Sequence, residues 1–170
     1  GAEYVYPAAT HTRFEHVLGT MYLAGVVAEN LPANLDEGEK RAVKVAALLH
    51  DVGHAPFSHL FEPMLQKYVG KTHEDMSTSI ILNSELSNVL QNEGLDPNLI
   101  SKLCVGKSEN QRRAYLNQII RSSVDVDKMD FVLRDSYHTG AGYGGVDIFR
   151  LIYTMDVLNG NLAVDVTALS

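Results

Sequence analysis

One segment of the chain, from Leu48 to His59, reads LLHDVGHAPFSH. It ends an apolar helical pattern and contains three histidines within ten residues, with His50 and Asp51 adjacent just before Gly53. Buried imidazole and carboxylate groups cost free energy unless they are paired, hydrogen-bonded or bound to a metal. Both groups are natural ligands of divalent Mn, Fe, Ni or Zn. We therefore expect His50 and Asp51 to lie at the end of a buried helix and to be two ligands of a metal ion.

Two ligands do not complete a metal site, so further ligands must come from other segments. His16 is one candidate, because it lies beside an apolar stripe with Arg13 on the same helix face. Asp127 is another, on a long helical segment. Plainer interpretations remain open: His50 could interact only with the C-terminus of its helix. The acidic residues of the long segment could form a solvated face with neighbouring cations: Asp127, Asp130, Asp135, Lys128 and Arg134.

Helical spacing of apolar residues extends over most of the chain. After Thr12, positions i, i+3, i+4 and i+7 predict a buried helix face: Phe14, Val17, Leu18, Met21, Gly25 and Ala28. Asp36 and Thr72 have the spacing of capping boxes and predict two further helix starts. Pro56 suits the first turn of a short helix that carries His59 and Glu62. Asp96-Pro97 opens another helix, which Gly106 ends.

The last third of the chain combines a long helical signal with a glycine-rich loop. The signal covers residues 111–138, with a break expected near residues 122–125. Residues 139–145 predict a loop, because so many glycines destabilise a helix, and they lack the context of a phosphate-binding loop. A short helix follows from Asp147, and residues 157–162 predict a hairpin around Asn159-Gly160. The chain is therefore predicted to be one all-α domain over residues 1–170, with a small C-terminal β-hairpin.

The composition is that of an ordinary globular domain. Of 170 residues, 45% are hydrophobic and 21% are charged, which argues against disorder. The net charge of −7 argues against duplex DNA as a partner, because DNA-binding proteins usually carry a basic face. The single Cys104 cannot form an intrachain disulfide, and no stretch has the length of a membrane span or the pattern of a leader. We therefore expect a cytoplasmic protein without a membrane partner.

Four segments, taken in order, resemble the HD-domain phosphohydrolases: residues 11–16 (HTRFEH), 48–59 (LLHDVGHAPFSH), 72–74 (THE) and 125–135 (DVDKMDFVLRD). More narrowly, the chain resembles the deoxynucleoside triphosphate (dNTP) triphosphohydrolases, which include the bacterial dGTPases and the SAM-and-HD-domain enzyme of animals. The resemblance spans nearly the whole chain. It implies an all-helical, metal-dependent enzyme that attacks the α-phosphorus of a dNTP and releases nucleoside and triphosphate.

The resemblance also implies the roles of individual residues. A divalent metal ion (Mn, Fe, Ni, Zn or Mg) would be held by four ligands: His16, His50, Asp51 and Asp127. His59 and Glu62 would assist catalysis, with His54 beside them. Contacts to the triphosphate would come from three residues: Arg13, His73 and Lys128. Phe131 would pack on the sugar, and Asp135 would accept a hydrogen bond from the sugar 3′-hydroxyl.

The chain departs from the family pattern at two positions and at its ends. Phe131 stands where such enzymes often carry Tyr, so a hydroxyl is missing there, and Ala9 replaces an expected Gly. Relatives carry helices before residue 4 and a large region after the hairpin, which supply base contacts and form oligomers. The chain is therefore a fragment, an excised domain or a minimal family member, and we expect a homo-oligomer for the full-length protein.

Two other functions stay open beside dNTP hydrolysis. One is a different HD-domain nucleotide phosphatase or phosphodiesterase. The other is a nucleotide-binding regulatory domain with weak catalytic activity, because the substrate cleft would be truncated. All three take a nucleotide as partner.

Overall fold

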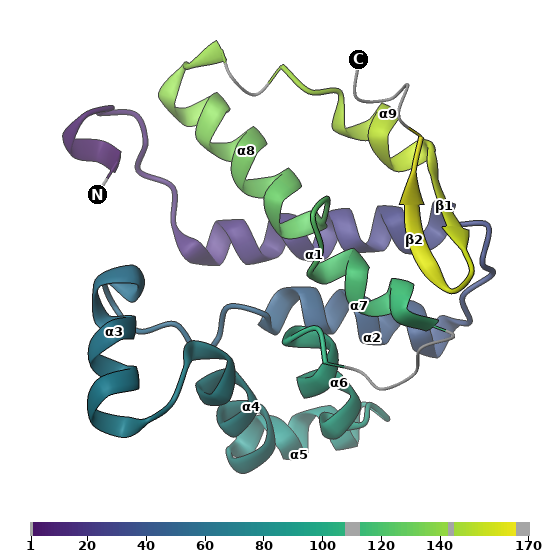
Figure 1. Cartoon of the computed structure of the whole chain (residues 1–170), viewed down its shortest axis with the longest axis horizontal. Helices are drawn as coiled ribbons and strands as arrows, with labels where there is room; N and C mark the ends of the chain where they lie inside the picture. The colour runs from purple at the N-terminus through teal and green to yellow at the C-terminus, as the bar shows by residue number, and fades with distance from the viewer. Residues whose placement is uncertain (1, 108–112, 143–144, 166–170) are drawn as a thin grey trace.

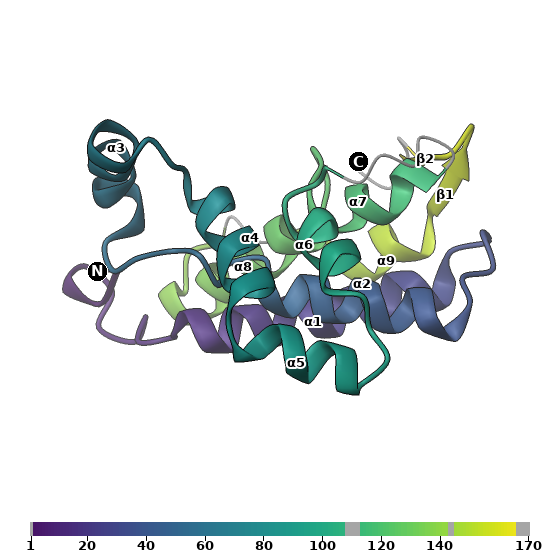
Figure 2. The same ribbon diagram turned by 90° about the horizontal axis from the view of Figure 1, so that it is seen from below.

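The computed structural model of the chain describes residues 2–107, 113–142 and 145–165, apart from the side chains of Ser58 and His59. Helices dominate it (Figures 1 and 2). In chain order the elements are η1 (Ala2–Tyr4), α1 (Arg13–Asn30), α2 (Glu37–Leu49), α3 (Ser58–Val69), α4 (His73–Asn83), α5 (Glu85–Asn92), α6 (Pro97–Cys104), α7 (Ala114–Ile120), α8 (Val126–Thr139), α9 (Ile148–Tyr153), β1 (Met155–Leu158) and β2 (Asn161–Val164). The prediction of an all-α fold with a small C-terminal hairpin is confirmed. None of the helices in the described ranges is long and apolar enough to cross a membrane.

The core forms where α1 packs against α2 on one side and α8 on the other (Figure 1). Small and branched side chains of α1 and α2 share one buried cluster: Leu23, Ala24, Val27, Val43, Ala46 and Ala47. The alanines let the two helix backbones approach closely, because the distance between packed helices depends on the side chains at the contact. This packing fixes the ends of α1 and α2 relative to each other.

The buried face of α1 differs from the predicted stripe. Phe14 is 68% exposed and Leu18 is 38% exposed, whereas Thr20 and Leu23 are buried. The physical reason is the position of the first two turns, which extend past the end of α2 (Figure 1). The part of α1 that carries His16 therefore borders an open end of the molecule rather than the centre of the core.

The expected break in the long helical segment separates α7 from α8. Asp125 begins α8, because its carboxylate accepts hydrogen bonds from the backbone N–H groups of Lys128 and Ser122, both at 2.8 Å. The hairpin β1–β2 is antiparallel, and both turn residues, Asn159 and Gly160, have positive φ, as the Asn-Gly pair predicted.

Helix α3 projects from the end of the molecule near the N-terminus (Figures 1 and 2). Its described side chains are all at least partly exposed. Pro56 lies before the helix rather than in its first turn, because Phe57 adopts a left-handed backbone conformation (φ 54°) and the helix begins after it. Glu62 joins α3 to α4, since its Oε1 lies 2.5 Å from Nδ1 of His73.

Candidate metal centre

A capping box at the start of α1 fixes the direction of His16. The Oγ1 atom of Thr12 accepts a hydrogen bond from the backbone N–H of Glu15, and Oε2 of Glu15 accepts one from the backbone N–H of Thr12 at 2.6 Å. Such reciprocal bonds satisfy N–H groups that the first turn leaves without partners. One turn later, the hydroxyl of Thr20 donates to the carbonyl of His16 at 2.9 Å.

The end of α2 presents His50 and Asp51. The Nδ1 atom of His50 lies 2.7 Å from the carbonyl oxygen of Ala47, so Nδ1 donates and Nε2 carries the lone pair. The turn that follows is held by Gly53, whose N–H donates to Oγ of Ser77 at 3.0 Å. A Cβ atom at Gly53 would collide with the backbone of α4, which packs directly on this turn. Glycine is therefore required for α4 to fix the turn.

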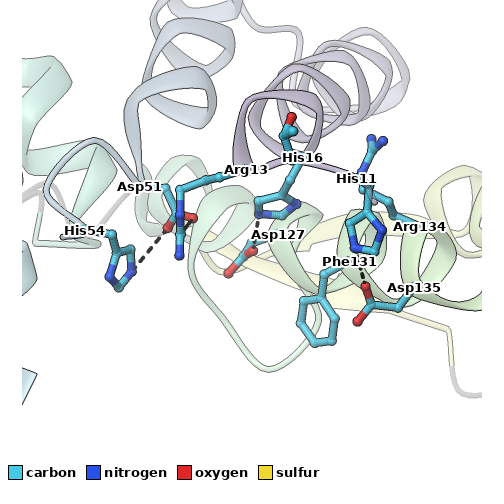
Figure 3. A pocket seen from close by; sticks show the side chains of 10 residues that line it. His11, Arg13, His16, Asp51, His54, Asp127, Phe131, Arg134 and Asp135 are labelled. Carbon is cyan, nitrogen blue, oxygen red and sulfur yellow. Dashed lines mark hydrogen bonds and ion pairs between the residues drawn. The ribbon is translucent and has the colours of Figure 1, made fainter. Parts of the chain in front are cut away.

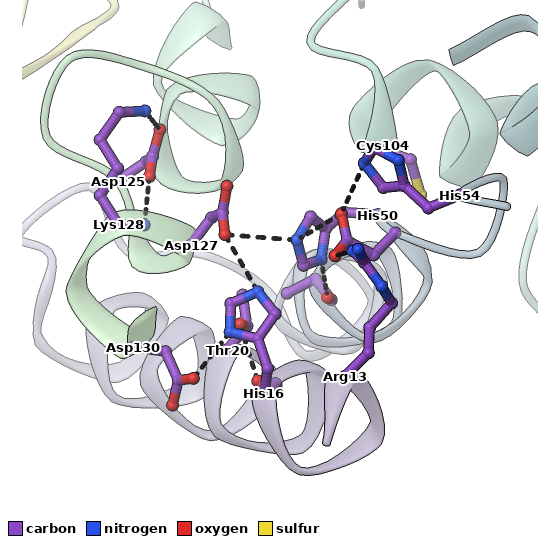
Figure 4. A network of polar contacts seen from close by, with 12 residues as sticks. Arg13, His16, Thr20, His50, His54, Cys104, Asp125, Asp127, Lys128 and Asp130 are labelled. Atoms are coloured by element: carbon purple, nitrogen blue, oxygen red, sulfur yellow. Dashed lines mark hydrogen bonds and ion pairs between the residues drawn. The ribbon is translucent and has the colours of Figure 1, made fainter. Parts of the chain in front are cut away.

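The first turn of α8 adds Asp127. Its Oδ1 lies 3.0 Å from Nε2 of His16 and 3.5 Å from Nε2 of His50. Ligand-type atoms of His16, His50 and Asp51 all lie within 4.8 Å of one another. Figure 4 shows the side chains of His16, His50 and Asp127 converging from α1, the end of α2 and α8. The structure thus brings together the four residues that the sequence proposes as metal ligands.

These residues fit a divalent metal ion. The Nε2 atom of His50 is buried and has no hydrogen-bond partner in the described part of the chain, although Oδ1 of Asp51 lies 3.2 Å away. Buried polar atoms without a partner are rare and often mark a site for an ion or water. Two imidazole nitrogens and two carboxylates are a donor set that suits first-row transition metals.

A second layer of contacts orients His16. Its Nδ1 lies 2.7 Å from Oδ2 of Asp130, and Arg134 donates to both oxygens of that carboxylate, at 2.9 and 2.8 Å. Gly19 makes room for this group, because a Cβ atom there would collide with Oδ1 of Asp130 and with the Arg134 guanidinium. Carboxylates behind metal-ligating histidines hold the ring in place and make it a better ligand.

The facing acids and imidazoles shift each other's pKa values. Burial lowers the pKa of His16, but its contacts with Asp127 and Asp130 outweigh burial and raise it to about 9. Burial likewise disfavours the charged form of Asp127, yet its contacts with His16 and His50 hold the pKa of that carboxyl well below its usual range. In the metal-free state His16 therefore carries the positive charge that balances the carboxylates.

A cavity of about 440 Å³ opens on one side of this centre (Figure 3). Arg13 forms an ion pair with Asp51 at its wall. Phe131 and Asp135, one and two turns along α8 from Asp127, line the same cavity. These three residues are the ones in this cavity that the resemblance proposes as substrate contacts. Asp127, Phe131 and Asp135 therefore share one face of α8.

A second cavity, of about 250 Å³, opens on the other side of the centre. The imidazoles of His54 and His73 stack there, with centroids 4.2 Å apart. Burial lowers the pKa of His54, whereas the hydrogen bond from His73 lowers the pKa of Glu62. Lys128 also lines this cavity, and its Nζ lies 2.7 Å from Oδ2 of Asp125.

The predicted site residues therefore gather around one centre, with one exception. His59 belongs to α3, but its side chain lies outside the described part of the structure, so its role stays a prediction. Glu62, expected to act with His59, contacts His73, a predicted phosphate contact.

Sequence reasoning missed two residues near the centre. One interpretation of the sequence places Asp130 on a solvated face, but this residue is only 6% exposed and contacts His16. Its i, i+4 spacing to Arg134 was the available signal. His11 received no role, yet it lines the larger cavity, and its Nε2 lies 2.9 Å from Oδ1 of Asp135.

Comparison with known families decides what this centre belongs to. The HD domain matches residues 13–135, which contain all four proposed metal ligands. The chain belongs to the HD-domain family. HD domains bind divalent metals, and the expected resemblance to HD-domain phosphohydrolases is confirmed.

Individual HD-domain relatives support the narrower resemblance to the dNTP triphosphohydrolase branch. The chain is 38% identical to the deoxynucleoside triphosphate triphosphohydrolase SAMHD1 homolog of Dictyostelium discoideum, over 81% of this chain and 29% of that protein. A hypothetical protein of Aquifex aeolicus has a similar crystal structure, with a TM-score of 0.85 and 36% identity over 99% of this chain and 44% of that one. A phosphohydrolase of Bacteroides thetaiotaomicron gives a TM-score of 0.78 and 30% identity, over 96% of this chain and 39% of that one. The chain spans 28%, 37% and 29% of three of the curated relatives that it matches.

Proposed function

We propose that this HD domain hydrolyses deoxynucleoside triphosphates to nucleoside and triphosphate, with a divalent metal ion held by His16, His50, Asp51 and Asp127. One observation carries the proposal. Asp51, His54 and Asp127 line both cavities, so the proposed metal centre lies between them. A long substrate that occupied both cavities would have an internal bond at the metal centre, rather than its end.

The two cavities differ in the chemistry they offer to such a substrate. The larger one offers an aromatic face, Phe131, and a carboxylate, Asp135, which suit a sugar and its hydroxyl. The smaller one offers cations, Lys128 and Arg121, together with the His54–His73 stack, which suit phosphates. With the sugar on one side and the phosphates on the other, the α-phosphorus lies at the centre. Cleavage there releases triphosphate as one piece.

The residues of the chain then have separate tasks. When bound, a divalent ion supplies a nucleophile near neutral pH and offsets charge on the phosphate. Arg13 and Lys128 offset further negative charge as the transition state develops. His59, assisted by Glu62 and with His54 beside it, donates a proton to the leaving oxygen of the nucleoside. We extend the proposal to a homo-oligomer for the full-length protein, as the resemblance to the dNTP triphosphohydrolases implies.

Product analysis tests the proposal directly. The protein is incubated with each of four dNTPs and Mn²⁺, and the products are separated by ion-exchange chromatography. We expect nucleoside and inorganic triphosphate in equal amounts, and no products from Asp51→Ala. Release of orthophosphate or pyrophosphate would assign the chain to another class of HD nucleotide hydrolases. Tight nucleotide binding without products would assign it to a regulatory role.

A further inference from the structure

We infer that His11 is a positioning residue that holds Asp135, so that one oxygen of this carboxylate accepts a hydrogen bond from a substrate hydroxyl. The inference rests on the proposed function for the identity of the substrate. The pair itself is observed: Nε2 of His11 lies 2.9 Å from Oδ1 of Asp135 at the wall of the larger cavity (Figure 3). A carboxylate only accepts hydrogen bonds, so Nε2 is the donating nitrogen.

The His11 ring is held firmly in this orientation. Its side chain is 16% exposed and stacks on His138, with ring centroids 4.7 Å apart and an interplanar angle of 28°. Its backbone directly precedes Thr12, the capped start of α1. The ring therefore joins the segment just before α1 to the last turns of α8.

The other ring nitrogen of His11 makes no comparable contact. The Nδ1 atom of His11 is buried and has no hydrogen-bond partner among the residues that the structure describes. Burying a polar nitrogen without a partner costs free energy. A purely apolar side chain at this position would avoid this cost, but it could not donate to Asp135. The histidine is explained by what its Nε2 does to Asp135.

The electrostatics of Asp135 determine which substrate group it takes. Its side chain is 43% exposed, and within the described part of the chain only His11 makes a hydrogen bond or ion pair with it. One oxygen is thus engaged and the other is available to the cavity, as Figure 3 shows. A carboxylate repels phosphate but accepts from a neutral hydroxyl. In a 2′-deoxynucleotide the only free sugar hydroxyl is at the 3′ position.

Fixing one oxygen sets the direction of the other. A free carboxylate rotates and offers either oxygen, whereas a carboxylate bound to His11 offers one oxygen in one direction. Such preorganisation lowers the cost of orienting the substrate at the reacting centre. Loss of His11 therefore weakens the hydrogen bond between the 3′-hydroxyl and Asp135, although the carboxylate of Asp135 is still present.

Kinetics on paired substrates test this positioning role. His11→Leu removes the donor, and His11→Gln keeps an N–H donor in nearly the same place. We expect His11→Leu to lower kcat/KM for a dNTP roughly tenfold, the size of one well-placed hydrogen bond. Activity toward the 2′,3′-dideoxy analogue, which lacks the hydroxyl, should stay unchanged, and His11→Gln should restore most of the loss. Equal losses on both substrates would overturn the inference.

A double-mutant comparison separates this role from a structural one. In the Asp135→Ala background, His11→Leu should have no further effect on kcat/KM, because His11 acts through Asp135. Full additivity of the two losses would contradict the inference.

A spectroscopic measurement decides the contact independently of turnover. Long-range ¹H–¹⁵N correlation on ¹⁵N-histidine-labelled protein reports which ring nitrogen of His11 carries hydrogen. We expect hydrogen on Nε2 in the wild type and a changed His11 signal in Asp135→Ala. If the protein cleaves dNTPs but Nε2 of His11 carries no hydrogen, the inference about His11 is overturned while the proposed function stands. Its presence in a protein that neither binds nor cleaves dNTPs would refute the proposed function and the hydroxyl contact, and leave only the His11–Asp135 pair.

Discussion

The Nδ1 atom of His16 lies 2.7 Å from Oδ2 of Asp130, while Nε2 of the same ring lies 3.0 Å from Oδ1 of Asp127. One imidazole therefore joins an inner carboxylate at the proposed metal centre to an outer carboxylate on the same helix (Figure 4). Arg134 holds the outer carboxylate through two hydrogen bonds. The orientation of His16 thus depends on residues that do not touch the metal.

Removal of Asp130 tests this dependence. We expect Asp130→Ala to weaken metal binding by about 10- to 100-fold, the usual effect of losing such an outer contact. Titration of the metal-free protein with Mn²⁺ or Fe²⁺ measures it. Asp127→Ala, which removes a proposed ligand, should weaken binding further. Unchanged metal affinity in Asp130→Ala would contradict the assigned role.

Gly19 offers a second test that changes no polar group. A Cβ atom at this position would collide with Asp130 and Arg134, so Gly19→Ala should displace the outer carboxylate and lower metal affinity. Gly25 on the same helix is a matched control, because its Cβ would meet only the flexible side chain of Lys44 at 3.4 Å. Gly25→Ala should keep metal affinity and raise the free energy of unfolding by up to about 1 kcal/mol, the helix propensity of alanine over glycine. Similar effects of the two variants in metal titration and urea unfolding would refute this account.

The stability of the metal-free protein should fall as the pH rises from about 6.5 to about 9. Contacts with Asp127 and Asp130 raise the pKa of His16 in the folded state to about 9, above its ordinary value of 6.5. The raised pKa stabilises the folded state fully when the pH is below the pKa of the unfolded state. This contribution is lost as the pH rises through the pKa of the folded state. Urea unfolding of metal-free protein across this range measures the effect. His16→Gln should abolish this part of the pH dependence, and the same slope in both proteins would contradict it.

Metal binding should show the opposite pH dependence, with an affinity that rises as the pH rises. A metal ion needs the unprotonated imidazole, so it displaces the proton from His16, and metal affinity rises with pH over the same range. Metal titrations at three pH values measure this, and proton release in weakly buffered solution provides a second readout. Metal affinity that is independent of pH would exclude His16 as a ligand.

Glu62 should contribute to turnover but not to metal binding. Its carboxylate accepts from Nδ1 of His73 at 2.5 Å and lines the cavity proposed for phosphates. We expect Glu62→Gln to lower kcat by roughly 10²-fold or more, the usual contribution of groups that position a proton donor or acceptor. Metal content by elemental analysis should stay the same. Glu85→Gln, at an exposed position on α5, is the control and should behave as the wild type.

The predictable parts of this fold are those that local sequence determines. The capping boxes at Asp36 and Thr72 begin α2 and α4 as expected, because a cap involves residues three positions apart. The Asn159-Gly160 turn is local in the same sense. The exposure of Phe14 was not predictable, because it depends on where α2 ends in space and not on the period of α1.

The candidate metal centre also has residues that the sequence predicts and residues that only the tertiary structure shows. His50 and Asp51 are predictable from their place at the end of an apolar helix, and His16 and Asp127 are candidates for the missing ligands, to which the resemblance then assigns that role. The role of Asp130 depends on a ring 114 positions away in the sequence. A charged residue beside Lys and Arg is most often solvated. Only the tertiary structure shows that Asp130 is not.

The placement of Asp127, Phe131 and Asp135 on successive turns of α8 fixes a length. Eight residues of α-helix span about 12 Å, so the distance from the proposed metal centre to the sugar end is constant as long as α8 stays helical. Inserting one residue between Asp127 and Asp135 would turn one of them away by about 100°. In the proposed binding mode, nucleoside mono-, di- and triphosphates share the same separation between α-phosphorus and sugar, so the stretch of α8 from Asp127 to Asp135 would not distinguish them. Any selection for the number of phosphates would then fall to the smaller cavity on the opposite side of the centre, which residues of α4, α7 and the start of α8 help to line.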